Sequence, residues 1–156
     1  MSPSIRLAIF PDDREAVLDI WREFVASPSV SLDFQGNEAE FAALPGKYAP
    51  PAGRILLAEQ AGAILGCVAL RKVDPAICEM KRLYVRPAGR GIGLGRRLVE
   101  RLIAEARDAG YAEMRLDVLA EFERARALYR ALGFGPADPV TVNPLPGTSF
   151  LGRYLI

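Results

Sequence analysis

The sequence predicts an α+β (mixed α/β) fold with a mostly antiparallel sheet of seven strands. Short apolar runs typical of strands are interspersed with segments whose apolar residues recur every three or four positions, as on one face of a helix. Three of the strand runs follow one another with only short turns between them, and strands joined in that way are antiparallel neighbours. At 156 residues, 51% of them hydrophobic, the chain suits one domain, residues 1–156.

The first third of the chain predicts one strand, one long helix and an irregular segment. Hydrophobicity alternates over residues 5–10 as it does in a strand. A helix begins after an Asp-Asp pair and runs to about Val25. Residues 27–53 are rich in Pro, Gly and Ser, apart from a short helical patch around residues 38–44. We expect this least regular part of the chain to form a wall of the substrate pocket.

The remaining elements follow in an order that indicates how the strands run. Three strands come first, over residues 54–59, 63–72 and 77–85. They are followed by a helix over 93–109, a strand over 111–119, a helix over 121–132, and strands starting at 134 and over 149–155. Because a helix lies between the strands 77–85 and 111–119, these two should be parallel neighbours in an otherwise antiparallel sheet.

Composition narrows the classes of function. The formal net charge is only +1, which argues against nucleic acid as the main partner. No apolar run is long enough to span a bilayer and the N-terminus lacks the layout of a signal peptide, so we expect no membrane partner and a cytoplasmic location. The chain has no histidine, and Cys67 and Cys78 lack the spacing of a metal or redox motif. We therefore expect no metal and two reduced cysteines in the core.

Residues 80–97 carry the strongest functional signal. A proline ends the strand 77–85, and four glycines precede the next helix: Gly89, Gly91, Gly93 and Gly95. Glycines leave the backbone amides uncovered, and the first N–H groups of a helix, with its dipole, favour a phosphate. Basic residues also gather in this segment although the chain as a whole is almost neutral. The segment therefore predicts a phosphate-binding turn, the alternative being a tight connection that binds nothing.

The glycine spacing excludes two common phosphate-binding patterns. The dinucleotide fingerprint needs glycine at its first, third and sixth positions, but the sixth residue counted from Gly89 is Leu94. A nucleoside-triphosphate loop needs Gly-Lys-Ser/Thr where this chain has Gly-Arg-Arg. The pattern that fits is Arg90-x-x-Gly93-x-Gly95 directly after Leu-Tyr-Val. In this motif, and in the order of its elements, the chain resembles the GCN5-related N-acetyltransferase (GNAT) superfamily.

The resemblance implies a three-layer fold with helices on both faces of the sheet and acetyl-CoA (coenzyme A) held where the strands 77–85 and 111–119 splay apart. Family members bind the pyrophosphate through successive backbone amides. By position the motif here comprises Arg90, Gly91, Ile92, Gly93, Leu94, Gly95 and Arg96. The pantetheine arm would lie beside Leu83, Tyr84 and Val85, and the amide of Leu83 would face the thioester carbonyl.

The same resemblance implies two catalytic residues. Glu79 is the expected base, because an alkyl amine with a pKa of about 10.4 must lose a proton before it attacks; the alternative is an exposed glutamate beside Lys81. Tyr129, in Leu-Tyr-x-x-x-Gly-Phe, resembles the family tyrosine that protonates the departing thiolate, the alternative being an aromatic packed in the core. Many relatives have Asn where this chain departs with Phe122.

The acceptor is less well defined by the sequence. Phe34, Gln35 and Tyr48 lie in the irregular segment and are the expected substrate-binding residues. We predict an acetyl-CoA-dependent N-acetyltransferase that transfers acetyl directly, in a ternary complex, to a primary amine of a small molecule. The alternatives are a protein N-terminal or lysine acetyltransferase and a non-catalytic acyl-CoA sensor. Dimers are frequent in this superfamily, so a homodimer is a further expectation.

Overall fold

The computed structural model describes residues 2–32 and 36–156, and its strands form one seven-stranded sheet in the order β1-β2-β3-β4-β5-β7-β6. The strands are β1 (Ser4–Leu7), β2 (Arg54–Gln60), β3 (Ala63–Lys72), β4 (Ile77–Val85), β5 (Glu113–Val118), β6 (Gly135–Pro136) and β7 (Ser149–Tyr154). The helices are α1 (Arg14–Ala26), α2 (Asn37–Ala43), α3 (Leu94–Asp108) and α4 (Glu123–Ala131), with short 3-10 helices η2 (Gly46–Tyr48) and η3 (Pro87–Gly89). Of the strand pairs, β4 with β5 is parallel and the others are antiparallel. The predicted fold class and the parallel pair are confirmed.

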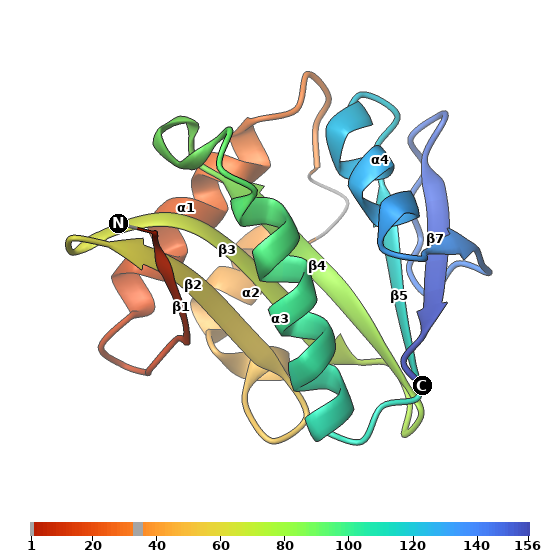
Figure 1. Ribbon diagram of the computed structural model, residues 1–156, viewed down its shortest axis with the longest axis horizontal. Coiled ribbons are helices and arrows are strands. Elements are labelled where there is room, and N and C mark those ends of the chain that lie inside the picture. Colours follow the sequence, from red (N-terminus) through yellow and green to blue (C-terminus); the bar gives the residue numbers. More distant parts are fainter. Residues whose placement is uncertain (1, 33–35) are drawn as a thin grey trace.

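Helices cover both faces of the sheet, as Figure 1 shows: α3 and α4 lie on the near face, and α1 and α2 lie behind it. The core on the near face packs Leu98 and Leu102 of α3 against strand residues such as Met80 and Met114. The core on the far face is built around Trp21 of α1. Both helical layers are held by apolar side chains that the period of the sequence predicts.

The strands β4 and β5 pair at one end only. Their register runs from Ile77 opposite Glu113 to Glu79 opposite Arg115, and no pairing follows beyond that point in the described sheet. On its other side, β4 has a register shift against β3, and Arg82 takes a left-handed φ of 61° there. This is a β-bulge, which bends a strand and disrupts its ladder. The edge of β4 that faces β5 is therefore open from Met80 onward.

Other expectations from composition can be checked in the described ranges. Cys67 and Cys78 are free thiols in the buried interior. Among residues 2–32 and 36–156 no group of three or more His, Cys, Asp or Glu side chains could hold a metal ion. Over the same ranges, no helix combines the length and the apolar character that crossing a membrane requires.

Candidate active site

The glycine turn forms an uncovered row of backbone amides at the start of α3. Gly91 and Gly93 have φ values of 84° and 73°, a left-handed conformation that L side chains rarely adopt. A Cβ added at either position would meet no atom within 4 Å, so the turn borders open space. No side chain of the described residues caps the N-terminus of α3. The first N–H groups of this helix are therefore left for an external acceptor.

A groove of about 930 Å³ runs along this turn. One wall is the last part of β4 with the start of α3, and the other is the start of α4. Most of the predicted cofactor-binding residues line it: Leu83, Tyr84, Val85, Arg90, Gly91, Gly93, Leu94, Gly95 and Arg96. Ile92, predicted with them, is not among the lining residues. Its side chain is exposed.

Arginines of the same segment have different roles. The Nε of Arg90 donates to the carbonyl of Val85 at 3.0 Å, which folds the side chain back over the strand end. Arg86 pairs with Glu23 at 3.0 Å and donates to the carbonyl of Ile64. The Arg86 guanidinium thus ties β4 to α1 and β3. Arg90 and Arg96 border the groove directly.

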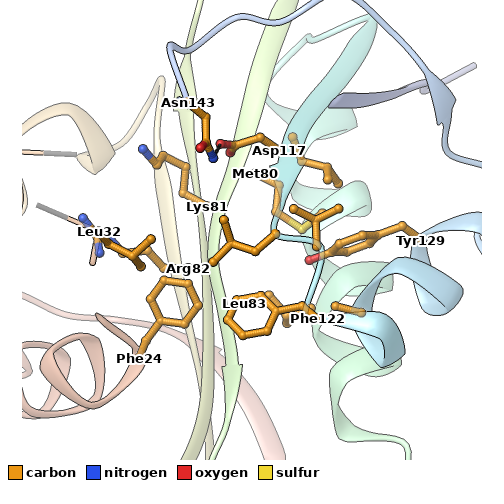
Figure 2. A pocket seen from close by; sticks show the side chains of 14 residues that line it. Phe24, Leu32, Met80, Lys81, Arg82, Leu83, Asp117, Phe122, Tyr129 and Asn143 are labelled. Carbon is orange, nitrogen blue, oxygen red and sulfur yellow. Dashed lines mark hydrogen bonds between the residues drawn. The ribbon is translucent and has the colours of Figure 1, made fainter. Parts of the chain in front are cut away.

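Where β4 and β5 diverge, a second cavity of about 70 Å³ opens beside the groove. Figure 2 shows its lining, with Met80 and Leu83 of β4 facing Tyr129 of α4 and with Asp117 at the end of β5. The two cavities share four lining residues: Phe24, Leu83, Phe122 and Ala125. A ligand that enters along the groove can therefore extend its end into the smaller cavity.

Tyr129 presents its hydroxyl to this cavity. The ring is buried and packs edge-on against Phe134, with 5.8 Å between ring centroids. The hydroxyl makes no hydrogen bond within the described part of the chain. Burial, and after it the nearby Asp117 charge, raise the pKa of Tyr129 above its ordinary value. The phenol therefore keeps its proton at neutral pH, as a group that donates a proton must.

Glu79 lies next to the cavity but is not one of its lining residues. It is fully buried, and both carboxylate oxygens are engaged. Oε1 accepts from Nε of Arg71 at 2.7 Å, and Oε2 accepts from the hydroxyl of Thr141, also at 2.7 Å. The predicted base is thus an ion-paired carboxylate, held by a loop residue far along the chain.

A second carboxylate, Asp117, lines the cavity itself. Its Oδ2 accepts from the Asn143 amide at 2.7 Å, so the loop after β6 fixes its orientation (Figure 2). Its charge also contributes to the raised pKa of Tyr129. The sequence analysis did not single out Asp117. The alternation of buried and partly exposed residues along β5 was a possible signal. It turns the Asp117 side chain away from the near-face core, close to where β4 and β5 part.

Two cations lie on the same part of β4. Lys81 lines the cavity, and burial lowers its pKa against the opposing effect of Glu79 and Glu40. The Arg82 guanidinium lies over Trp21, 4.7 Å from the ring, and its Nη2 donates to Asn37 and Glu40. Its Nε and Nη1 are buried without a partner in the described structure. The sequence analysis did not assign either residue to the acceptor.

The predicted acceptor residues have different outcomes. Phe34 and Gln35 lie outside the described residues. Tyr48 is in the core, packed edge-on against Trp21 at 5.1 Å, and its hydroxyl donates to Glu40. It does not line the cavity, so any effect on an acceptor would pass through Glu40 and its partner Arg82. Phe122 lines both cavities.

An amide-lined groove that leads into the gap between two parallel strands is the arrangement that the resemblance to the GNAT superfamily implies for the cofactor site. Residues 15–134 match the family model described as "Acetyltransferase (GNAT) family", and the chain belongs to this family. A Schizosaccharomyces pombe protein described as an uncharacterized N-acetyltransferase is 37% identical over 150 residues, which cover 95% of this chain and 92% of that protein.

Solved structures of acetyltransferases have the same fold as this chain. YncA of Salmonella typhimurium, described as a putative acetyltransferase with its cofactor acetyl-CoA, is 25% identical with a TM-score of 0.73, covering 100% of this chain and 95% of that one. An acetyltransferase of Streptococcus agalactiae has the same fold, with a TM-score of 0.81 at 20% identity and coverage of 99% of both chains. The protein is thus an N-acetyltransferase that uses acetyl-CoA as its cosubstrate.

Proposed function

We propose that this N-acetyltransferase transfers the acetyl group of acetyl-CoA directly to a primary amine of a small molecule. The observation that carries the proposal is the cavity between β4 and β5, which joins an amide-lined groove to a tyrosine hydroxyl that has no partner among the described residues. Its volume of about 70 Å³ is roughly twice a water molecule's share of the liquid. Small reacting groups fit there, while the bulk of a large acceptor would lie outside.

The chain's own groups fit the donor along the groove. The amides from Gly91 to Arg96 would hold the pyrophosphate, with Arg90 and Arg96 adding positive charge. The open edge of β4 from Leu83 to Val85 would pair with the amides of the pantetheine arm, as an added strand does. The Leu83 amide, beside the bulge, would donate to the thioester carbonyl. The thioester itself supplies an activated acetyl group.

Tyr129 would protonate the sulfur as the carbon–sulfur bond breaks. Its hydroxyl faces the cavity and has no competing partner in the described chain. Burial and the Asp117 charge raise the pKa of Tyr129, which keeps the proton in place until negative charge develops beside it. General acid catalysis of this kind contributes about 10²–10⁴ in rate.

The acceptor amine must lose its proton, and Glu79, or a water that it orients, is the proposed base. Its buried carboxylate is placed by Arg71 and Thr141, and it lies two residues before Lys81, which lines the cavity. Asp117 is a second candidate, because it lines the cavity itself and its charge acts on Tyr129. The two carboxylates come from neighbouring strands, so variants at each separate their roles.

Direct transfer is favoured over a covalent acyl-enzyme. Ser and Cys are absent from the lining of the smaller cavity as the structure describes it. Burial raises the pKa of both Cys67 and Cys78 to about 12, and Cys67 directs its thiol to the carbonyl of Arg82. A thiol with such a pKa is a poor nucleophile at neutral pH.

Two measurements test the proposal against its alternatives. Binding of CoA is titrated by calorimetry, and CoA release from acetyl-CoA is then followed with diverse small amines and with peptides that have free N-termini or lysines. We expect turnover with small amines. Binding without turnover on any acceptor would make the protein an acyl-CoA sensor, and turnover only with peptides would make it a protein acetyltransferase.

A further inference from the structure

The geometry points to an acceptor that carries a carboxylate next to its amine, a small α-amino acid or a close analogue, with the carboxylate bound by Lys81. This inference rests on the proposed function and adds the chemical class of the acceptor. It also states which feature of the site would distinguish a free amino acid from the N-terminus of a protein.

Within the described residues, Lys81 is the cation at the cavity that remains without a partner. No hydrogen bond or ion pair engages its ammonium group within the described chain, although it lines the cavity and is half-buried. The other cation in the lining, Arg82, is held by Glu40 and Asn37. Holding a half-buried ammonium without a counterion is costly, and the lowered pKa of Lys81 reflects that cost. An anion from a ligand would remove it.

The carboxylates nearest to Lys81 are already committed to other cations. Glu79 is bound by Arg71 at 2.7 Å and by Thr141. Glu40 is bound by Arg82 at 3.0 Å and accepts from Tyr48, and these contacts hold its pKa below the ordinary value although burial opposes this.

Arg82 adds to the positive character of the same region. Its side chain is 1% exposed, and two of its nitrogens are buried without an acceptor in the described structure. The Arg82–Glu40 pair therefore leaves donors of the cation unsatisfied. Figure 2 shows the end of the Lys81 side chain and the Arg82 guanidinium on the side of the cavity that faces away from Tyr129. A negative group on that side of the acceptor is favoured by charge.

Asp117 supplies the opposite charge at the edge of the cavity where Figure 2 shows its carboxylate beside Asn143. Asn143 holds its carboxylate in place at 2.7 Å, and its field reaches Tyr129. An acceptor ammonium that approaches the thioester near Leu83 and Tyr129 would meet Asp117, while its carboxylate would meet Lys81. Both poles of a zwitterion thus have a matching partner, and the rest of the lining that Figure 2 labels includes the apolar Phe24, Leu32 and Phe122.

This arrangement discriminates between free amino acids and protein N-termini. An N-terminal residue of a protein has a neutral amide where the free amino acid has its carboxylate, and an amide cannot form an ion pair with Lys81. The amine of an amino acid amide has a pKa of about 7.7–8.0, so it loses its proton more easily than the amine of the free acid. Without recognition of the carboxylate, the amide would therefore be the better acceptor.

The test compares L-amino acids having small or apolar side chains with their matched amides as acceptors, using kcat/KM for CoA release. We expect the acids to be preferred by about 10- to 100-fold, the range of one good charge-assisted hydrogen bond. Lys81→Met should abolish the preference and leave the KM for acetyl-CoA unchanged. Lys72→Met, which removes an exposed lysine of the same sheet, is the matched control and should keep the preference. Thermal unfolding verifies that each variant folds.

Failure of the inference and failure of the proposed function give different results. If the wild type acetylates the amides as well as the acids, or if Lys81→Met keeps the preference, the carboxylate subsite is wrong while small-molecule acetylation stands. If no amine is acetylated, the proposed function is wrong. Calorimetry of the CoA-bound protein with an L-amino acid and its amide then decides the subsite alone, because binding of the acid must exceed binding of the amide and must be lost in Lys81→Met.

Discussion

Replacing Tyr129 with Phe removes one hydroxyl and little else. The ring packs against Phe134 at 5.8 Å and fills the near-face core, and phenylalanine keeps this packing. The hydroxyl has no hydrogen-bond partner in the described chain, so its loss leaves no buried donor or acceptor unsatisfied. We therefore expect the free energy of unfolding of Tyr129→Phe to stay within about 0.5 kcal/mol of the wild type.

The effect on catalysis should be much larger. If Tyr129 protonates the leaving sulfur, its loss lowers kcat by about 10² or more, which corresponds to about 2.7 kcal/mol of transition-state stabilisation. The KM for acetyl-CoA should hardly change, because the groove residues that would hold the donor are untouched. The assay is the steady-state rate of CoA release with an acceptor amine at saturating acetyl-CoA.

A control variant separates this role from the general loss of a phenol. Tyr154 is 75% exposed at the end of β7, and Tyr154→Phe should leave kcat and KM unchanged. If Tyr129→Phe has the same kcat as the wild type while it folds normally, Tyr129 is not the acid and the mechanism must be revised.

Three further outcomes follow from the geometry. Glu79→Gln should lower kcat by about 10²-fold while Asp117→Asn changes it less, and the reverse order would make Asp117 the base. Gly93→Ala places a side chain on a residue with a φ of 73° beside the groove. The free energy of unfolding should therefore fall by about 1 kcal/mol, and the KM for acetyl-CoA should rise about tenfold. An unchanged KM would contradict pyrophosphate binding by the backbone amides of this turn. The Arg6 guanidinium, bonded to Asp13 at 2.7 and 2.9 Å, holds the pKa of that carboxyl below its usual range. This stabilisation is present above the pKa of Asp13 in the unfolded state and is lost as pH falls through its pKa in the folded state. Asp13→Asn should therefore lower the melting temperature at pH 7 but not at strongly acid pH. A melting temperature that stays lower than that of the wild type in strong acid would contradict this.

The fold was predictable because its signals are local. The apolar period of α3, the turns between β2, β3 and β4, and the helix between β4 and β5 indicate the layers and the parallel pair directly from adjacent residues. The glycine turn was predictable for the same reason. The phosphate binding proposed for it depends on backbone conformation within a few residues, and glycine marks such positions in a sequence.

The acceptor side was less predictable, because its contacts join distant segments. Thr141 engages Glu79 across a separation of 62 residues, and Asn143 engages Asp117 across 26. Both come from an irregular loop after β6, whose path no local pattern specifies. The absence of an ion pair for Lys81 within the described residues can be recognised only when the partners of Glu79 and Glu40 are known. Local sequence therefore predicts a donor site, whereas the proposed acceptor class depends on contacts between distant segments that only the structure shows.

The most direct test of the account is a crystal structure of the protein with CoA and an L-amino acid acceptor. The account predicts that the sulfur lies between β4 and β5 within hydrogen-bond distance of the Tyr129 hydroxyl, with the pyrophosphate on the amides from Gly91 to Arg96 and the acceptor carboxylate on Lys81. A sulfur held away from Tyr129, or an acceptor bound outside the cavity between β4 and β5, would contradict it.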